Sequence, residues 1–321
     1  MKVLILGGGG FLGRKLALKL AKRQELRGKS IDQMVLADIV DPKPIEAPFP
    51  VHYQPCDISN PASVADCIDA ETDVIYLLAA VVSAHAEEDL DAGLSANMMG
   101  VLNVLERCRA LGTCPVVVFT SSIAVFGGDT PQPFNDFSLP NPQTSYGAQK
   151  MIGEYLVTDY SRRGLIDGRG FRLPTITVRP GKPNRAASSF MSSIFREPLN
   201  GEAANCPVEP DFKQLYLSPR KCIENLIKGA ELQAADLGQN RCMTMPGKVW
   251  SIGQMIEAMT NVAGPAAATR ITWQKQPEIE GILKGWHMDI RTDRGLALGL
   301  EPDDSFEDNI RIYLEDDAPQ S

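Results

Sequence analysis

The sequence predicts an α/β fold, in which a doubly wound parallel sheet is followed by a small C-terminal α/β region. Short apolar runs alternate with helical patterns from Met1 to about Pro180, as in parallel strands joined by crossover helices. A glycine-rich turn follows the first of these runs and precedes a helical pattern. The length of 321 residues suits one two-part unit or two small domains.

The first part of the chain is expected to contain six strands and four helices. The first strand is apolar at consecutive positions, as expected for burial on both faces of a sheet. The expected strands are Val3–Leu6, Met34–Asp38, Val51–Gln54, Val74–Leu78, Val116–Thr120 and Thr175–Val178. Helical patterns lie at Phe11–Lys22, Pro61–Ile68, Glu87–Ala110 and Ser145–Arg163. The segment Thr130–Asn141 is rich in proline and polar residues and predicts a loop.

Beyond Pro180 the pattern is looser and several prolines interrupt it. Helices are expected at Ala186–Phe195, Pro219–Leu232 and Ile252–Val262. We therefore predict a dinucleotide-binding domain at residues 1–180 and a small substrate-binding region at residues 181–321, interleaved with the first domain. The acidic tail from Glu315 onward is expected to fray.

The glycine turn after the first strand predicts a Rossmann-type dinucleotide site. Gly7 allows a tight turn, Gly10 lets the backbone approach a pyrophosphate, and Gly13 lets the helix pack close to the strand. The helix that begins near Phe11 and Leu12 directs free N–H groups and the positive end of its dipole toward the phosphates. An ordinary glycine-rich turn is the alternative, and the strand–turn–helix context favours the cofactor site.

Asp38 ends the second expected strand and distinguishes between two nicotinamide cofactors. An acid at this place accepts hydrogen bonds from the adenosine ribose hydroxyls and repels a 2′-phosphate. The sequence therefore predicts NAD as the cofactor, rather than NADP.

Tyr146 and Lys150 have the spacing Y-x-x-x-K and follow Ser121 and Ser122 by about 25 residues. On a helix, residues four apart share a face, so the two side chains project together. A free tyrosine titrates near pH ~10, and nearby positive charges can lower its pKa by ~1–3 units. The pattern alone is common on solvated helix faces. Its distance from a serine-bearing strand end indicates that Tyr146 is a general base.

These motifs, in this order, resemble the extended short-chain dehydrogenase/reductase family, which includes nucleotide-sugar epimerases. The G-x-x-G-x-x-G spacing and the segment Val118–Gly127 carry the resemblance. It implies that Ser122, counted back from the V-F-G at the end of that segment, orients the substrate hydroxyl. It further implies that Tyr146 removes a proton and that both Tyr146 and Lys150 contact the cofactor, Lys150 at the nicotinamide ribose.

The same resemblance implies further cofactor contacts after the third and fourth strands, on the following helix and near the sixth strand. These are Asp57, Ile58, Leu78, Ala79, Ala80, Asn97, Leu173 and Pro174. Two alternatives stay open from the sequence. The stretch Leu78–Ala80 could be simple strand core, and Asn97 could be a helix-surface residue instead of one that orders the site.

The C-terminal half departs from the nucleotide-sugar epimerases. Thr175 stands where they usually carry an asparagine, and Leu217-Ser218-Pro219-Arg220 stands where they usually carry a valine–aspartate pair. The run from Arg179 to Leu199 resembles instead a dehydrogenase of the family that oxidises a four-carbon sugar acid at C2. Arginines in this run suit a small hydroxylated carboxylate, although each charge could equally be a surface residue. The expected substrate contacts are Ser122, Tyr146, Thr175, Arg185, Ser188 and Ser189.

Two other classes of function stay open beside this hypothesis. A nucleotide-sugar epimerase or dehydratase would retain NAD between turnovers. A dinucleotide sensor would bind without turnover, and the presence of Ser122, Tyr146 and Lys150 argues against it.

Composition narrows the expected partners. The net charge of −8 argues against nucleic acid, and no segment has the ~20 uninterrupted apolar residues that span a membrane. The chain starts with a strand instead of a signal peptide, and its seven scattered cysteines form no C-x-x-C pair, which predicts reduced thiols in the cytoplasm. The three histidines lack metal-ligand spacing, so we expect no metal.

The helices expected at Glu87–Ala110 and Ser145–Arg163 resemble the pair that meets across a two-fold axis in this family. Six apolar residues are expected on the faces that turn away from the sheet: Leu90, Leu94, Met98, Leu105, Leu156 and Tyr160. Because exposed apolar stripes usually mark an interface, we predict a homodimer with a four-helix contact.

Overall fold

The computed structural model describes residues 1–181, 189–276 and 288–319. The chain divides into two compact units. The first comprises Met1–Val125, Thr144–Arg172 and Ile223–Met243, and the second comprises Phe126–Gln143, Leu173–Cys222 and Thr244–Ser321. Each unit therefore combines three separate segments of the sequence. The division into domains at residue 180 stays a prediction.

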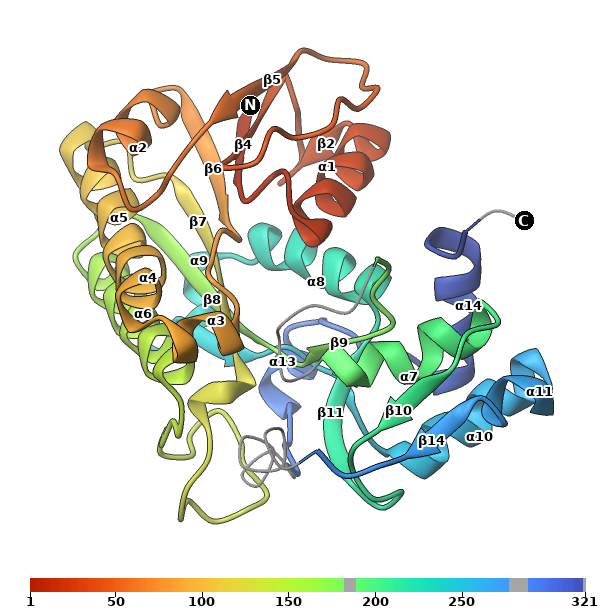
Figure 1. The fold of residues 1–321 in the computed structure, drawn as a ribbon. Helices are drawn as coiled ribbons and strands as arrows, with labels where there is room; N and C mark the ends of the chain where they lie inside the picture. Colours follow the sequence, from red (N-terminus) through yellow and green to blue (C-terminus); the bar gives the residue numbers. More distant parts are fainter. Residues whose placement is uncertain (182–188, 277–287, 320–321) are drawn as a thin grey trace. The chain divides into compact units, whose positions relative to one another are not determined.

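A seven-stranded sheet forms the centre of the first unit (Figure 1), in the order β12-β8-β7-β6-β1-β4-β5. Its strands are β1 (Lys2–Leu6), β4 (Gln33–Asp38), β5 (Val51–Pro55), β6 (Thr72–Leu77), β7 (Val116–Ser122), β8 (Asp167–Leu173) and β12 (Cys242–Thr244). The pairs β5–β4, β4–β1, β1–β6 and β6–β7 are parallel. This order matches the 3-2-1-4-5-6 arrangement of doubly wound dinucleotide-binding sheets, which confirms the predicted fold class. From β1, the next two strands of the chain are added on one side and the later ones on the other. The order of the strands therefore reverses between β1 and β6, where such sheets bind their ligands.

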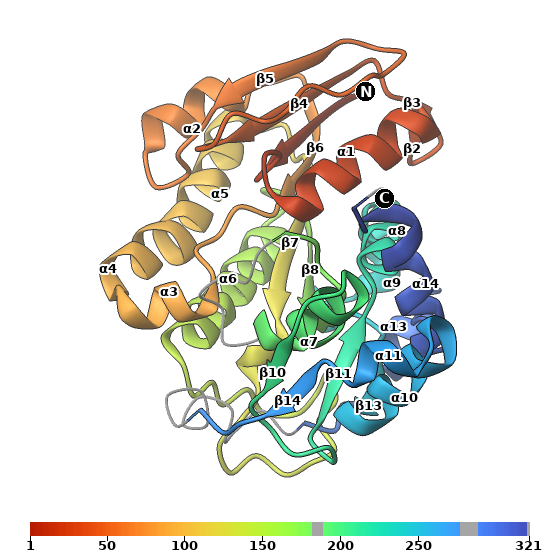
Figure 2. The same cartoon turned by 45° about the vertical axis from the view of Figure 1, so that its right-hand side comes forward.

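Helices cover both faces of this sheet, which explains why β1, β6 and β7 carry runs of buried apolar residues. On one face lie α2 (Pro61–Cys67), α5 (Gly100–Leu111) and α6 (Ser145–Arg162), and on the other lie α1 (Phe11–Arg23) and α8 (Pro219–Glu231) (Figures 1 and 2). The remaining elements of the unit are short: β2 (Glu25–Leu26), β3 (Lys29–Ser30), α9 (Ala234–Leu237) and a 3-10 turn at Ile123–Val125. None of the helices that the structure describes is both long and apolar enough to cross a membrane.

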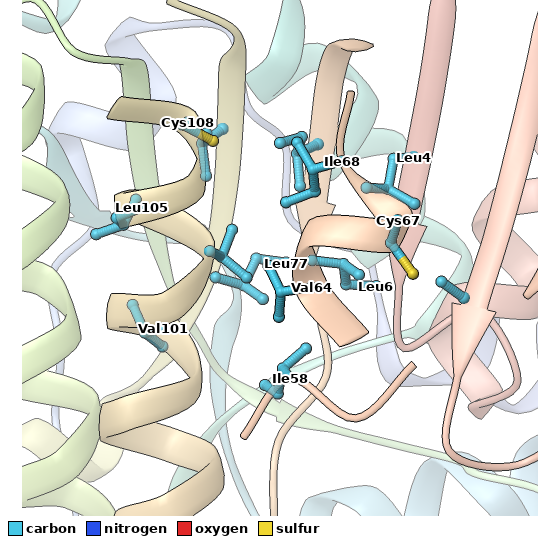
Figure 3. Close-up of a cluster of buried hydrophobic side chains, with 14 of the residues drawn as sticks. Leu4, Leu6, Ile58, Val64, Cys67, Ile68, Leu77, Val101, Leu105 and Cys108 are labelled. Atoms are coloured by element: carbon cyan, nitrogen blue, oxygen red, sulfur yellow. The ribbon is translucent and has the colours of Figure 1, made fainter. Parts of the chain in front are cut away.

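The core on the α2–α5 side holds the carboxyl ends of the strands in place. Aliphatic side chains of β1 and β6, including Leu6 and Leu77, pack there against Val64 of α2 and Val101 of α5 (Figure 3). Ile58, an expected cofactor contact, belongs to this core and is 5% exposed. Burying such side chains stabilises each by roughly 1.5–3 kcal/mol, so the loops that follow the strands start from a rigid base.

The prediction of a single helix at Glu87–Ala110 is wrong. The segment forms α3 (Ser83–Glu88), α4 (Leu90–Gly93), a π-helical turn at Leu94–Met99 and then α5. The side chain of Asp89 breaks the helix, because it accepts a hydrogen bond from the Ala92 N–H at 3.0 Å and so caps a new start. The π turn adds one residue, which rotates the following residues by ~100° around the axis.

Of the six apolar residues expected on an exposed face for a dimer, only Leu90 is exposed. Leu105 is fully buried, and Leu156 and Tyr160 pack against the same core. The apolar side chains that are exposed on these helices are Leu90, Met99, Ile152 and Tyr155.

The second unit contains two small sheets. One has the order β13-β11-β9, with β9 (Thr175–Ile176), β11 (Lys213–Leu217) and β13 (Lys248–Ser251). The other pairs β10 (Ala204–Cys206) with β14 (Ile271–Trp273). The helices are α7 (Phe190–Leu199), α10 (Ile252–Ala263), α11 (Pro265–Ala268), α13 (Asp293–Ala297) and α14 (Phe306–Asp316). The apolar faces of α7, α10, α11 and α14 share one core around Phe195, Met255 and Phe306. The start expected for α7, at Ala186, lies outside the described residues.

The C-terminal tail differs from expectation. Glu315 and Asp316 form the last turn of α14, and the Arg220 guanidinium pairs with them at 2.9 and 2.6 Å. The helix is also capped at its start, where Ser305 accepts a hydrogen bond from the Asp308 N–H. The prediction that the tail frays from Glu315 onward is therefore wrong for Glu315 and Asp316.

The loop expected at Thr130–Asn141 is irregular, as predicted, and belongs to the second unit. The ring of Phe134 stacks on Phe126 with 5.0 Å between centroids. The buried carboxylate of Asp136 accepts a hydrogen bond from the Thr244 N–H at 2.6 Å. These contacts tie the loop to the rest of its own unit.

Candidate active site

The glycine turn has the shape that a pyrophosphate site requires. Gly7 has φ +95°, and a Cβ there would lie 2.7 Å from the Ala79 nitrogen. A Cβ on Gly13 would lie 2.1 Å from the Gly7 oxygen, so the start of α1 can pack this closely only with glycine. Gly10 is the N-cap of α1 and has no side chain to occupy the free N–H groups of the first turn, which Phe11 and Leu12 begin. These features fit a bound dinucleotide phosphate.

Asp38 lies at the end of β4, beside the glycine turn. Its carboxylate accepts hydrogen bonds from the Gly9 N–H at 2.9 Å and the Val40 N–H at 3.2 Å. Two backbone donors fix the carboxylate, and its remaining lone pairs can accept hydrogen bonds from a ribose. This geometry fits the role expected for Asp38 in holding the adenosine ribose.

We expect Asp38→Ala to weaken NAD+ use and to relax the preference for NAD+ over NADP+, because the variant loses both the ribose contacts and the negative charge. The ratio of kcat/KM values for the two cofactors measures this. Asp41→Ala, which removes an exposed acid three residues along the chain, is the matched control. A wild-type enzyme that works better with NADP+ would contradict the assignment.

The other expected cofactor residues of the first unit lie along the same edge of the sheet. The N–H groups of Leu78 and Ala79 both donate to the Leu6 oxygen at 2.9 Å, so the end of β6 runs directly beside the glycine turn. Ala80 is exposed just beyond it. Asp57 is also exposed, and its Oδ1 accepts hydrogen bonds from the Ser59 N–H and hydroxyl. Leu173 and Pro174 belong to the second unit.

Asn97 is 1% exposed, so the helix-surface alternative is wrong. Its Oδ1 accepts a hydrogen bond from the Val81 N–H at 2.8 Å, and its Nδ2 donates to the Val81 oxygen at 3.1 Å. The same Nδ2 donates to Oε1 of Gln149 at 2.8 Å. Asn97 therefore ties the segment after β6 to helix α6, and it lies in the π turn that is typical of functional helices.

Tyr146 and Lys150 lie one turn apart on α6. Thr144 caps this helix by accepting a hydrogen bond from the Gly147 N–H at 3.1 Å. The Lys150 Nζ lies 5.6 Å from the centre of the Tyr146 ring and donates to the Thr120 oxygen of β7 at 2.9 Å. Lys150 is 2% exposed, and this burial lowers the pKa of its ammonium to about 8.

The two neighbouring serines have different environments. The hydroxyl of Ser121 is buried and donates to Oε1 of Glu154 at 2.5 Å. Ser122 is half-buried at the end of β7, and its Oγ accepts a hydrogen bond from the Ala124 N–H at 3.1 Å. Successive strand residues point to opposite sides. The arrangement favours Ser122 as the serine that meets a substrate.

The sequence analysis did not identify the residues that hold Asn97 and the serine–tyrosine–lysine group in place. Gln149 holds Asn97, and Glu154 holds both Ser121 and Arg172. One signal was present, since Glu154 follows Lys150 by the same four residues that separate Lys150 from Tyr146. Nothing in the local pattern marks Arg172 as the partner of Glu154.

The expected substrate residues of the second unit are only partly described. Thr175 lies in β9, and Ser189 precedes α7, whereas Arg185 and Ser188 lie outside the described residues. Arg196, another cation of that run, is buried and donates to Glu197 at 2.6 Å and to the Arg179 oxygen at 2.9 Å. Among the described residues, no three acidic, cysteine or histidine side chains are grouped so that they could hold a metal ion.

Known proteins resemble the chain along its whole length. The model of the NAD dependent epimerase/dehydratase family matches residues 3–216. A D-erythronate dehydrogenase from Cupriavidus necator is 47% identical over 98% of both chains. Another, from Haemophilus influenzae, is 39% identical over 99% of this chain and 100% of that one.

Among solved structures, a nucleoside-diphosphate-sugar epimerase from Agrobacterium tumefaciens is 41% identical. It superposes with a TM-score of 0.94 and covers 98% of this chain and 94% of its own. The family match spans the glycine turn, Asp38, Ser122, Tyr146 and Lys150. The chain therefore belongs to the NAD dependent epimerase/dehydratase family.

Proposed function

We propose that this protein is an NAD-dependent dehydrogenase that oxidises the C2 hydroxyl of D-erythronate to give 2-dehydro-D-erythronate. The observation that carries the reaction class is the buried ammonium of Lys150 beside the Tyr146 ring. The substrate is inferred from the full-length relatives that are named D-erythronate dehydrogenases. It agrees with the resemblance of the Arg179–Leu199 run to a sugar-acid dehydrogenase.

In this mechanism, Tyr146 acts as the general base. The positive charge of Lys150 favours its phenolate, which takes the proton of the C2 hydroxyl. Ser122 orients that hydroxyl and donates a hydrogen bond to the carbonyl oxygen as it forms. Gly7, Gly10 and Gly13 with Asp38 hold the cofactor. NAD+ held there would supply the acceptor for the hydride that leaves C2.

The negative charge of the substrate needs a partner close to the reacting carbon, because the carboxylate is one bond from C2. We propose that Arg185 pairs with it and that Thr175, Ser188 and Ser189 bind the other oxygens. We expect Arg185→Met to raise the KM for D-erythronate by ten- to a hundredfold, with little change in the KM for NAD+. A lost charge-assisted contact costs ~1.5–3 kcal/mol, which corresponds to that range. Unchanged kinetics would place the carboxylate elsewhere.

Epimerisation of a nucleotide sugar is the second candidate, because one similar solved structure is named an epimerase. A dehydrogenase releases NADH with each turnover, whereas an epimerase returns the hydride to its substrate. A screen of four-carbon sugar acids and UDP-sugars with NAD+, followed by NADH absorbance and product analysis, separates the two. We expect NADH with D-erythronate. Turnover of a UDP-sugar, and of no sugar acid, would contradict the proposed function.

We further propose that two copies associate through the exposed apolar residues Leu90, Met99, Ile152 and Tyr155. Light scattering at micromolar concentration is expected to give about twice the chain mass of 35.0 kDa. Tyr155→Glu should lower it to one chain mass, while Leu18→Glu, on the exposed side of α1, should not. A wild-type mass of one chain would contradict the dimer.

The proposed location is the cytoplasm, where thiols stay reduced. All seven cysteines are free, and six of them are buried.

A further inference from the structure

A buried network of three polar side chains lies directly behind the proposed catalytic residues. Glu154 is 2% exposed and Arg172 is 3% exposed. Nη2 of Arg172 donates to Oε2 of Glu154 at 2.8 Å, and its Nε donates to Oε1 at 2.9 Å, so the contact is bidentate. Oε1 also accepts the hydroxyl of Ser121 at 2.5 Å. Bidentate contacts of this kind fix geometry as well as neutralise charge.

The network continues the row of catalytic side chains. Tyr146, Lys150 and Glu154 follow one another at four-residue spacing on α6, so they share one face of the helix. Two consecutive contacts join this face to β7. Lys150 donates to the Thr120 oxygen, and the next contact joins Glu154 to Ser121. The residue that follows on β7 is Ser122.

Close packing sets the distance between α6 and β7. A Cβ on Gly153 would lie 2.6 Å from Cζ of Phe119, so the helix rests directly on the strand. The Lys150 ammonium lies 5.1 Å from the centre of the same ring. In such a dry region, charges interact more strongly than in water. An unbalanced charge on Glu154 would therefore act on both Lys150 and Tyr146.

We propose that Ser121, Glu154 and Arg172 form a positioning network for the catalytic residues. Glu154 fixes the end of β7 through Ser121, and this sets the direction of Ser122. Arg172 neutralises the Glu154 carboxylate, which leaves the ammonium of Lys150 to act on Tyr146 and the cofactor. The inference rests on the proposed role of Tyr146 as the base.

Other charged groups around α6 must be compared with this pair. The elements packed against α6 contribute His85, Glu87 and Glu88 from α3, Asp91 from α4 with its cap Asp89, and Glu106, Arg107 and Arg109 from α5. Glu87 accepts the Ser145 N–H at 2.8 Å, and Glu106 accepts the Tyr160 hydroxyl at the other end of the helix. All eight are exposed or half-buried, so solvent screens them more than it screens Glu154 and Arg172.

The test uses two variants that unbalance the pair in opposite directions. Glu154→Gln leaves the Arg172 cation, which favours the Tyr146 phenolate, so the midpoint of the acidic limb of the kcat–pH profile should fall by about one unit. Arg172→Met leaves the Glu154 anion, so that midpoint should rise by a similar amount. The double variant should return it to within a few tenths of a unit of the wild-type value.

Two further variants separate position from charge. Ser121→Ala should lower kcat about tenfold, the size expected for a lost contact to a charged group, while the midpoint and NAD+ affinity stay unchanged. Asp159→Asn, which breaks the exposed Asp159–Arg162 pair on the same helix, should change neither kcat nor the midpoint. If Glu154→Gln and Arg172→Met lowered kcat equally and did not shift the midpoint of the pH profile in opposite directions, the proposal would be overturned. The three residues would then have a structural role only.

Loss of one buried charge can prevent folding of Glu154→Gln or Arg172→Met. The charge-conserving variants Glu154→Asp and Arg172→Lys therefore provide a second test. They keep both charges but alter the geometry, so the midpoint should stay and kcat should fall. Unchanged kcat in both would overturn the positioning role. The phenolate of Tyr146 can also be titrated by ultraviolet difference spectroscopy with NAD+ bound, using Tyr146→Phe as the blank. This readout needs no turnover, so it tests the network even if no sugar acid is a substrate.

Discussion

Replacement of Tyr146 by phenylalanine is expected to lower turnover of D-erythronate by at least ~10²–10⁴-fold, the range typical of a lost acid–base group. The variant keeps the aromatic ring and removes only the hydroxyl that would take the proton from C2. The cofactor contacts proposed for the glycine turn and Asp38 are untouched. The affinity for NAD+, measured by fluorescence titration, should therefore stay within a few-fold of the wild-type value.

Tyr155→Phe is the matched control, because Tyr155 lies on the same helix and is 63% exposed. Removal of the Tyr155 hydroxyl should leave turnover unchanged. If Tyr146→Phe retained near-normal turnover, Tyr146 could not be the base. If it lost NAD+ affinity in proportion to turnover, its role would be cofactor binding instead.

Lys150→Met is expected to lower turnover strongly and, at neutral pH, to stabilise the folded protein. Without the ammonium, the Tyr146 phenolate loses the charge that favours it, and opposite charges at short range shift a pKa by ~1–3 units. Turnover at neutral pH should therefore fall by roughly ten- to a thousandfold from this effect alone. Loss of the expected contact to the nicotinamide ribose should add to it, seen as a weaker affinity for NAD+.

The gain in stability follows from the pKa of Lys150, which burial lowers from 10.5 to about 8. The folded state then binds fewer protons than the unfolded chain between these two values. Burial of Lys150 therefore opposes folding fully below about pH 8, and this penalty disappears as the pH rises toward 10.5. At 1.36 kcal/mol per pKa unit, the penalty is on the order of 3 kcal/mol. Loss of the hydrogen bond to the Thr120 oxygen offsets part of the gain.

Urea unfolding at pH 7 and pH 10 measures the difference. Lys150→Met should have the higher midpoint at pH 7, and its advantage should shrink at pH 10. The exposed Lys29 provides the control, because Lys29→Met should change the midpoint little at either pH. If Lys150→Met were less stable than the wild type at both pH 7 and pH 10, burial of the Lys150 ammonium would not destabilise the folded protein.

The parts of the fold that depend on neighbouring residues could be predicted from the sequence. The first strand, the glycine turn and α1 depend on local apolar spacing and on backbone freedom at Gly7, and their bounds agree with the structure to within a residue. The α6 helix, with Tyr146 and Lys150 on one face, is equally local. The capping signal of Ser305 and Asp308 was also present, and would have predicted the ordered α14 helix.

The missed parts depend on contacts between distant segments. Arg172 is 18 residues from Glu154 in sequence, and only the sheet brings them together. The π turn is held by contacts of Asn97 with Val81, 16 residues away, and with Gln149, 52 residues away. Regular helical spacing continued through that turn and so placed Leu105 on the wrong face. The carboxylate partner of the substrate stays a proposal, because Arg185 lies outside the described residues.

The π turn at Leu94–Met99 limits how this protein can evolve. A substitution can remove the amide of Asn97, but it cannot easily convert the wide turn into a regular one, because the extra residue would remain. Deletion of one residue would restore an even helical repeat and rotate the two ends of the helix relative to each other by ~100°. Either Asn97 or the core face of α5 would then lose its place. Homologues that carry this asparagine contact should therefore share the length of this segment, even where the residues around it differ.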